Sequence, residues 1–391
     1  TYGGVAESIF KMGIGNQIGF KYADGTDLAE IFGYNYGSFI CELADDVISG
    51  ADAPSGATYT VTELGTTTEK YELVLGAETV DMNTLSDLYE DKLESVFACN
   101  IKTEKEDIPT FCYESDVQYK ASVSVAKPKV LIPVFPGTNC EYDSAKAFAR
   151  AGAEPEIFVI NNMTAAGIAK SVEDFALKVR ESQMVFIPGG FSGGDEPDGS
   201  GKFITSFFRN PEVKEAVMAL LNDRDGLMGG ICNGFQALIK LGLVPYGEIM
   251  DTDENCPTLT FNTIARHQSR LVRIRVASNK SPWLKKAQVG DVYTVPISHG
   301  EGRLLASKEL LMSLAENGQV LSQYVDFDGV PSSDIAHNPN GSIFAVEGLL
   351  SPDGRVFGKM GHSERIGTGL YKNVPGEFDM KLFESAVEYF K

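Results

Sequence analysis

From residue 127 onward, continuous apolar segments alternate with amphipathic ones, and this alternation restricts the possible fold more than any other feature. The apolar segments predict strands at Lys129–Phe135, Glu156–Ile160, Met184–Pro188 and Leu227–Ile231. The amphipathic segments predict helices at Asp143–Ala151, Val172–Glu181, Glu212–Leu221 and Phe235–Leu241. Strands that are apolar throughout are buried on both faces, so we expect an α/β domain with a parallel sheet covered by helices. Ligands of such sheets bind at the carboxyl ends of the strands.

A different pattern precedes this region. The segment Lys120–Lys129 (KASVSVAKPK) is small, polar and contains proline, which predicts a domain boundary near residue 126. Before it, short apolar stretches at Tyr34–Leu43 and Tyr71–Leu75 alternate with glycine-rich turns, and Leu85–Phe97 has a helical pattern. We therefore expect a smaller α+β domain over residues 1–126 and the larger α/β domain over residues 127–391.

Charge, apolar run length and cysteine content restrict the partners and the compartment that we expect for this protein. The net charge is −20, and residues 1–126 contribute 22 acidic and only 7 basic side chains, which disfavours nucleic acid as a partner. No apolar run approaches the roughly 20 residues of a membrane span, so we expect no membrane partner. Six cysteines without a Cys-x-x-Cys pair predict a reducing cytoplasm. Because the chain begins with Thr1 and not with methionine, we expect a processed product or a part of a longer chain.

The segment Gly230-Ile231-Cys232-Asn233-Gly234 has the form G-x-C-x-G and lies between a predicted strand and a predicted helix. This is the pattern of a nucleophile elbow with cysteine in place of serine. The tight turn lifts the sulfur out of the sheet, and the amino end of the helix favours the thiolate. A buried cysteine of the core fits the five residues equally well. The pentapeptide therefore leaves both interpretations open.

A cysteine nucleophile needs a base and a group that orients the base. His362 and Glu364 are two residues apart in GKMGHSER, so in an extended segment their side chains point the same way. That spacing lets the carboxylate hold one imidazole nitrogen while the other faces the thiol. The alternative is a charged surface turn. A zinc-deaminase site is excluded, because the sequence has no P-C-x-x-C.

An acyl-transfer site also needs amide donors for an oxyanion. The glycine-rich segment Gly189–Asp195 (GGFSGGD) follows the third predicted strand at the same edge of the sheet. We expect one donor from the amide of Gly190 or Phe191 and another from that of Asn233. A flexible loop is the alternative for this segment.

Taken together, these features resemble the class I (triad) glutamine amidotransferases, and more closely the carboxyl-terminal part of the phosphoribosylformylglycinamidine synthase family. The matching stretches, which span nearly all of residues 127–391, are PGTNCEYD (Pro136–Asp143), GGFSGGD, GGICNGFQ (Gly229–Gln236), SHGEGR (Ser298–Arg303), NPNGS (Asn338–Ser342) and HSER (His362–Arg365). Gly3–Phe20 and Gly33–Leu43 resemble the end of the second synthetase half of that family.

The resemblance implies glutamine as substrate, Cys232 as nucleophile, His362 as acid and base, Glu364 as its orienting group and Gln236 as a contact to the substrate. It implies no metal and no cofactor in this chain, since ATP and Mg²⁺ are expected in the synthetase domains, which would be its partners. It also implies that ammonia passes to an ATP-activated formylglycinamide ribonucleotide in purine biosynthesis. His299 is not expected to be catalytic. His267 lies in RHQSR, where the family pattern is altered, so we expect a structural turn there.

Two other functions remain as alternatives. One is a different hydrolase or a chaperone-like protein on the same sheet, with an elbow cysteine but no glutaminase activity. The other is a catalytically silent docking module, in which Cys232 would have ordinary thiol reactivity. In the second case Arg273 and Arg275, on one face of the predicted strand Leu271–Val276, would dock onto the acidic first domain; a solvated strand face is the favoured explanation of these two arginines.

Overall fold

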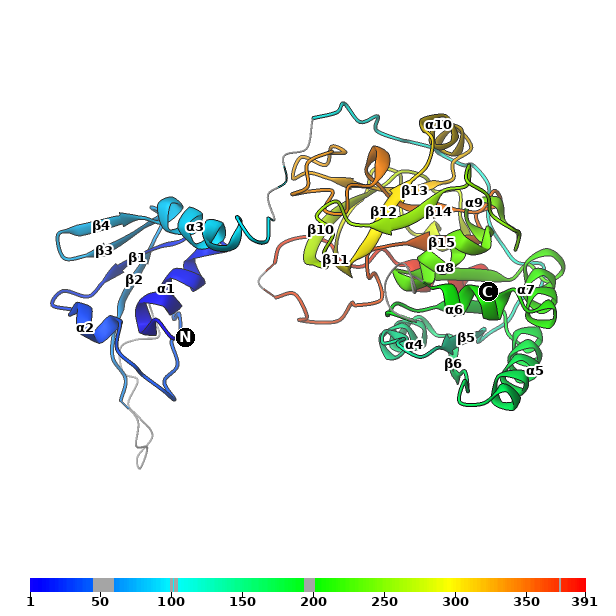
Figure 1. Ribbon diagram of the computed structural model, residues 1–391, viewed down its shortest axis with the longest axis horizontal. Helices are drawn as coiled ribbons and strands as arrows, with labels where there is room; N and C mark the ends of the chain where they lie inside the picture. The colour runs from blue at the N-terminus through cyan, green and yellow to red at the C-terminus, as the bar shows by residue number, and fades with distance from the viewer. Residues whose placement is uncertain (45–59, 99–100, 102–104, 193–200, 373) are drawn as a thin grey trace. The chain divides into compact units, whose positions relative to one another are not determined.

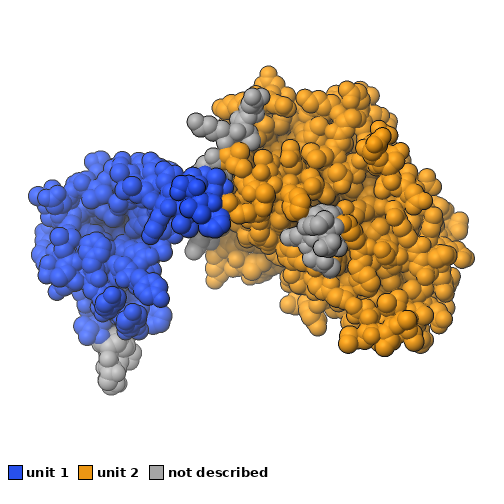
Figure 2. All heavy atoms as spheres, in the orientation of Figure 1, with its two compact units in different colours: residues 1–100 blue, residues 101–391 orange. Residues whose placement is uncertain are grey.

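The computed structural model describes residues 1–44, 60–98, 101, 105–192, 201–372 and 374–391. The chain divides into two compact units, residues 1–100 and residues 101–391 (Figure 2). Each unit has its own hydrophobic core. No helix in the described part of the chain is both long and apolar enough to cross a membrane.

The first unit contains a four-stranded sheet in the order β2-β1-β3-β4. Its elements are α1 (Gly4–Ile14), β1 (Gly19–Tyr22), α2 (Leu28–Ile31), β2 (Gly65–Thr68), β3 (Glu72–Leu75), β4 (Glu78–Asp81), α3 (Met82–Glu90) and η1 (Asp91–Leu93). A small core forms around Ile9, Phe20, Tyr22 and Ile31. The expected strand at Tyr71–Leu75 corresponds to β3, whereas the expected helix over Leu85–Phe97 begins and ends earlier as α3.

Two sequence-based expectations for the first unit fail in the structure. α3 begins at Met82 because the side chain of Asp81 caps it by accepting a hydrogen bond from the amide of Asn83. The apolar stretch Tyr34–Leu43 forms neither helix nor strand. Its aromatic side chains are exposed instead, and the rings of Tyr34 and Tyr36 stack on each other.

The second unit is built on a nine-stranded sheet in the order β11-β10-β13-β14-β15-β8-β7-β5-β6 (Figure 1). The strands of this sheet are β5 (Lys129–Val134), β6 (Glu154–Val159), β7 (Met184–Ile187), β8 (Leu227–Ile231), β10 (Gln268–Val276), β11 (Val292–His299), β13 (Val320–Val325), β14 (Val346–Leu350) and β15 (Val356–Lys359). A separate pair, β9 (Thr258–Phe261) and β12 (Glu301–Leu305), is antiparallel.

The sheet is mixed, and the expectation of a parallel sheet is correct for only one part of it. β6, β5, β7, β8 and β15 are mutually parallel, and they include all four strands predicted from the sequence. From β14 to β11 the pairing is antiparallel. A turn of five residues joins β14 to β15, and so short a connection cannot make a parallel crossover.

Helices lie around the sheet in this unit. They are α4 (Glu141–Ala151), α5 (Ala165–Glu181), α6 (Lys202–Phe208), α7 (Pro211–Asp223), α8 (Asn233–Leu241), α9 (Leu243–Tyr246), α10 (Lys308–Glu316) and α11 (Leu382–Tyr389), with two short 3₁₀ turns, η2 (Pro282–Leu284) and η3 (Ile343–Ala345). Four of them, α4, α5, α7 and α8, lie where the sequence predicts helices, whereas α6, α9, α10 and α11 were not predicted. α4 packs on α11, α5 packs on α7, and α8 packs on β8 and β15. Gly152 and Gly242 end α4 and α8 with positive φ values of 94° and 82°, which glycine adopts without strain.

The segment before β5 belongs to the second unit and extends along its surface. The amide of Phe111 donates to Oε1 of Gln323 (2.9 Å), and the amide of Ala121 donates to the carbonyl of Tyr389 (3.0 Å). Arg275 donates to the carbonyl of Phe111 (3.0 Å), and Arg273 donates to the carbonyl groups of Asp326 and Phe327. The compact unit therefore begins at residue 101, earlier than the composition change near residue 126, and both arginines are bonded within this unit.

Candidate active site

Cys232 occupies a sharp turn between β8 and α8. Its backbone has φ 54° and ψ −108°, a conformation that is strained for a residue with a side chain, and its amide donates to the carbonyl of Lys359 (2.8 Å). The flanking glycines are sterically required. A Cβ on Gly230 would lie 2.7 Å from the backbone of Gly234, and a Cβ on Gly234 would lie 2.1 Å from the carbonyl oxygen of Ile187. The G-x-C-x-G segment thus forms the predicted elbow.

His362 and Glu364 follow β15, which lies next to β8 in the parallel part of the sheet. The two carboxyl ends therefore meet at one edge and bring the elbow and the HSER segment together. Nδ1 of His362 is 2.6 Å from Oε1 of Glu364, and both residues are 1% exposed. Nε2 of His362 is buried and has no hydrogen-bond partner among the described residues. The alternative of a charged surface turn is wrong for this segment.

The electrostatics of the pair favour an imidazolium beside a carboxylate. Burial lowers the pKa of His362, but the Glu364 carboxylate and the thiols of Cys140 and Cys232 outweigh burial and raise it well above 6.5. For Glu364, burial raises the pKa, while the charges of His362 and Arg365 and the hydrogen bonds to the carboxylate lower it below its ordinary value of 4.5. His362 is therefore held in its protonated form by the groups around it.

The surroundings of Gly189, which follows β7, show how closely the side chains of His362, Cys140 and Cys232 approach one another. A Cβ placed on Gly189 would lie 2.8 Å from Cε1 of His362, 3.1 Å from Sγ of Cys140 and 3.4 Å from Cβ of Cys232. All three side chains thus border the small space left by the missing side chain of Gly189. Sγ of Cys232 also lies 3.8 Å from the carbonyl oxygen of Ser298.

In the loop after Gly189, the amides of Gly190 and Phe191, the two candidate oxyanion donors, have different hydrogen bonding. Gly190 has φ 152°, and a Cβ there would lie 2.5 Å from the carbonyl oxygen of Gly137, so only glycine fits. The amide of Phe191 donates to the same carbonyl (2.9 Å), which engages it and argues against an oxyanion role. Among the described residues, the Gly190 amide has no such acceptor. The rest of the predicted loop, Gly193–Asp195, lies outside the described residues.

Asn233 and Gln236 belong to a buried chain of hydrogen bonds that joins three segments of the site. Oδ1 of Asn233 accepts from the amide (3.2 Å) and the hydroxyl (2.6 Å) of Ser192. Nδ2 of Asn233 donates to Oε1 of Gln236 (2.8 Å), and Nε2 of Gln236 donates to the carbonyl of Glu301 (2.7 Å). The first turn of α8 therefore holds the glycine loop and the SHGEGR segment in fixed positions.

Cys140 is a site neighbour that the sequence reasoning missed. Its Sγ is 3.9 Å from Nδ1 of His362 and accepts a hydrogen bond from Arg365 (3.3 Å). The signal was present, because Cys140 follows β5 and lies in the PGTNCEYD stretch. Cys140, His362 and Glu364 bring nitrogen, oxygen and sulfur ligand atoms within 4.8 Å of one another, a donor set that suits zinc. The Arg365 guanidinium beside the sulfur opposes a divalent cation there.

The other two histidines near the elbow have different environments. His299 is 1% exposed, its Nδ1 lies 3.0 Å from Oδ1 of Asn262, and burial, with the charges of His362 and His267, lowers its pKa to about 3. The low pKa keeps this buried imidazole neutral, and the expectation that His299 is not catalytic stays a prediction. His267 is exposed, with Nε2 3.1 Å from the hydroxyl of Ser298, and its ring lies 5.9 Å from that of Phe191. His267 therefore lies at the edge of the site, beside Ser298 and Phe191.

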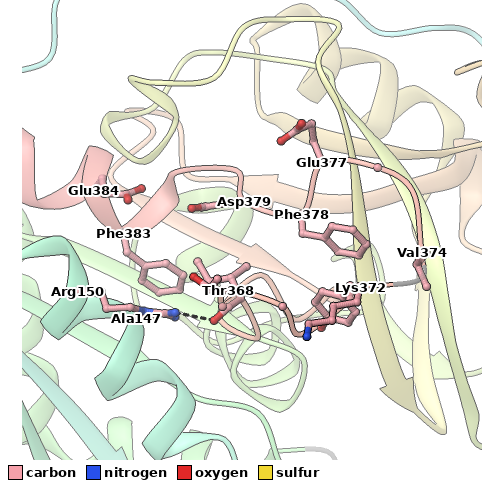
Figure 3. Close-up of a pocket in the computed structure, with 15 residues that line it drawn as sticks. Ala147, Arg150, Thr368, Lys372, Val374, Glu377, Phe378, Asp379, Phe383 and Glu384 are labelled. Atoms are coloured by element: carbon pink, nitrogen blue, oxygen red, sulfur yellow. Dashed lines mark hydrogen bonds between the residues drawn. The ribbon is translucent and has the colours of Figure 1, made fainter. Parts of the chain in front are cut away.

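A pocket of about 470 Å³ lies along the chain that follows Glu364 (Figure 3). α4 contributes Ala147 and Arg150 to it, and Nη1 of Arg150 donates to the carbonyl of Ile366 (2.7 Å). Neither Cys232 nor His362 lines this pocket. Its basic and acidic side chains are mixed, and they do not define one class of ligand.

The comparisons with known proteins agree with this geometry. The model of the CobB/CobQ-like glutamine amidotransferase domain matches residues 127–390, which makes the protein a glutamine amidotransferase by class. Phosphoribosylformylglycinamidine synthase subunit PurQ of Methanococcus maripaludis (strain C7) is 32% identical over 287 residues, which are 67% of this chain and 97% of the relative. The corresponding subunit of Dehalococcoides mccartyi is 34% identical over 275 residues, covering 68% and 98%. The chain belongs to the PurQ family of glutamine amidotransferases.

A chain in the solved structure of PurLQS from Thermotoga maritima is 26% identical, with a TM-score of 0.48; the match covers 68% of this chain and 100% of that one. The family model begins at residue 127, within the compact unit that starts at residue 101.

Proposed function

We propose that this chain hydrolyses glutamine and supplies the ammonia that converts formylglycinamide ribonucleotide to formylglycinamidine ribonucleotide in purine biosynthesis. The observation that carries the proposal is the buried convergence of Cys232, His362 and Glu364 at the ends of two adjacent parallel strands. Family membership supplies the substrate and the pathway, since the relatives are named as subunits of phosphoribosylformylglycinamidine synthase.

The first half-reaction forms a thioester. The Cys232 thiolate attacks the side-chain carboxamide carbon of glutamine, and the charge moves to the carboxamide oxygen. His362 then donates the proton on Nε2 to the departing nitrogen, the carbon–nitrogen bond breaks, and ammonia leaves. Glu364 keeps the imidazole in the orientation that directs Nε2 towards the reacting atoms.

The second half-reaction returns the enzyme to its starting state. His362, now neutral, takes a proton from water, and the hydroxide attacks the γ-glutamyl thioester. The carbon–sulfur bond breaks, glutamate leaves, and the Cys232 thiolate again faces the His362 imidazolium. The tetrahedral oxyanion in each half is held by the amides of Gly190 and Asn233, while Gln236 contacts the substrate.

Access to this site depends on a partner. Cys232 is 3% exposed, Gln236 is 5% exposed and His362 is 1% exposed, so glutamine reaches the thiol only when a covering segment moves. The synthetase domains, which we propose hold ATP and Mg²⁺ and receive the ammonia, are the expected partner for this opening. Residues 1–126 resemble the end of those domains. A reducing cytoplasmic compartment would keep the Cys232 thiol reactive.

The test is glutamine hydrolysis by the purified chain, alone and with the synthetase domains. We expect weak release of glutamate by the chain alone and faster release with the partner. Cys232→Ala should abolish hydrolysis and thioester trapping, and Cys256→Ala, at a cysteine outside the site, serves as the control. Full activity of Cys232→Ala would refute the assignment. Absence of labelling by an electrophilic glutamine analogue would favour the docking-module alternative.

A further inference from the structure

Two charged side chains are completely buried beneath the His362 segment. Nζ of Lys359, on β15, lies 3.1 Å from Oε1 of Glu347, on β14, and both side chains are 0% exposed. Removing two charges from water opposes folding, and the attraction between them often fails to compensate. The pair is therefore a poor device for stability alone, and its contacts indicate another role.

Both members of the pair hold the backbone that carries His362. Nζ of Lys359 donates to the carbonyl of Gly361 (2.9 Å) and to the hydroxyl of Ser363 (2.9 Å). Oε1 of Glu347 accepts from the amide of Gly361 (2.6 Å). Gly361 and Ser363 are the residues on either side of His362, so the ion pair fixes the peptide groups next to the imidazole.

Gly361 allows this close approach. A Cβ at that position would lie 2.6 Å from Cγ2 of Val295, 2.9 Å from Oε1 of Glu347 and 3.1 Å from Nζ of Lys359, so any larger residue would press on Val295 and on the ion pair.

Lys359 also contacts the other half of the site. Its backbone carbonyl accepts the hydrogen bond from the amide of Cys232 (2.8 Å), the residue whose strained turn presents the sulfur. One residue thus holds the nucleophile through its main chain and the histidine segment through its side chain. A displacement of about 1 Å between two reacting groups can lower a rate about 100-fold, so such a link has catalytic consequences.

We propose that the buried Lys359–Glu347 ion pair positions His362 relative to Cys232, which rests on the proposed glutaminase function. The three atoms nearest to a Cβ on Gly189 belong to His362, Cys140 and Cys232 and not to this ion pair, so we treat Lys359 and Glu347 as positioning residues. They act on the geometry of the acid and base and not on the binding of glutamine.

The experiment compares Lys359→Met with the double variant Lys359→Met/Glu347→Gln in the full chain. The double variant removes both charges, and its glutamine still offers an acceptor to the amide of Gly361. The control is Lys170→Met/Asp174→Asn, which removes an exposed ion pair on α5. For each protein the measurements are kcat and KM for glutamine, Tm, and the pH dependence of iodoacetamide alkylation at Cys232, followed by mass spectrometry.

We expect Lys359→Met to lower Tm and to lower kcat at least tenfold with KM changed less than twofold. The double variant should recover Tm but not kcat. Its Cys232 should be alkylated more slowly than that of the wild type at neutral pH, because the displaced His362 imidazolium no longer favours the thiolate. The control should match the wild type. If kcat recovers together with Tm, or if folded Lys359→Met keeps the wild-type kcat and alkylation profile, the pair is only structural and the proposal is wrong.

Two further results are distinguishable. If Lys359→Met does not fold, the double variant alone decides between the two outcomes. If the wild-type chain with its partner hydrolyses no glutamine, the proposed function fails, and the alkylation profile still tests whether the ion pair controls the Cys232–His362 geometry.

Discussion

Nδ1 of His362 and Oε1 of Glu364 are 2.6 Å apart in a site where both residues are almost completely buried. The two residues are two positions apart in the sequence, yet their hydrogen bond affects the chemistry at Cys232, which follows the adjacent strand β8. Because the carboxylate raises the pKa of His362 well above 6.5, the imidazole carries a proton at neutral pH and directs Nε2 away from Glu364. Nε2 of His362 can therefore donate a proton to a group that is attached to Cys232.

Glu364→Gln should reduce glutamine hydrolysis roughly 10²–10⁴-fold, because the amide neither orients the imidazole correctly nor stabilises its charge. Without the carboxylate, the pKa of His362 falls. The alkaline limb of the kcat/KM profile, where the acid loses its proton, should therefore move to lower pH. Steady-state assays between pH 6 and 10 would check both effects. An unshifted alkaline limb would show that Glu364 does not set this pKa.

Gly189→Ala should lower kcat by about 100-fold, since the added methyl group would lie 2.8 Å from Cε1 of His362 and displace the ring, and the overpacking should lower stability by about 1–3 kcal/mol. Gly15→Ala is a suitable control, because nothing lies within 4 Å of a Cβ at that helix end and its φ is −64°. The measurements are kcat and thermal unfolding of both variants. Wild-type activity of Gly189→Ala would show that the methyl group does not displace the His362 ring from its catalytic position.

Gln236→Ala should raise KM for glutamine about tenfold and lower kcat less, because the side chain would contact the substrate and not the reacting bond. The change also leaves Nδ2 of Asn233 and the carbonyl of Glu301 without their partner. Initial rates over a range of glutamine concentrations separate the two parameters. An unchanged KM would limit Gln236 to its structural role between α8 and the SHGEGR segment.

His299 should make the protein less stable as the pH falls. Its pKa is about 3 in the folded state and about 6.5 in the unfolded chain, so the stability from its neutral form is complete above pH 6.5 and is lost below it, by about 1.4 kcal/mol per pH unit. The raised pKa of His362 affects stability in the opposite sense, and its stabilising contribution is fully present below pH 6.5. The lowered pKa of Glu364 contributes fully above about pH 4.5.

Urea unfolding between pH 5 and 6.5 would measure this effect. His299→Gln keeps a donor for Asn262 but cannot take up a proton, so its free energy of unfolding should depend on pH more weakly than that of the wild type, by about one proton. Equal slopes for the two proteins would show that the imidazole is accessible to protons in the folded state.

The local parts of the fold and site were determined by the sequence alone. Continuous apolar runs predicted four of the five strands of the parallel region, and amphipathic periodicity predicted α4 and α8 up to their last residues, Ala151 and Leu241. The elbow at Cys232 and the pairing of His362 with Glu364 were also predictable, because both depend on short spacings along the chain. These features arise from steric restrictions and side-chain periodicity within a few residues.

Tertiary structure decided which of these segments meet. The pairing of β15 with β8 places HSER beside the elbow, and the antiparallel part of the sheet from β14 to β11 depends on pairings between distant segments that apolar periodicity does not reveal. Cys140 looked like one cysteine among six, and Phe191 looked equivalent to Gly190 until its amide was found bonded to Gly137. The sequence analysis assigned no role to Lys359, yet this lysine is fully buried against Glu347. Such roles depend on partners from distant segments, because burial and charge pairing are properties of the packed chain and not of any one stretch of it.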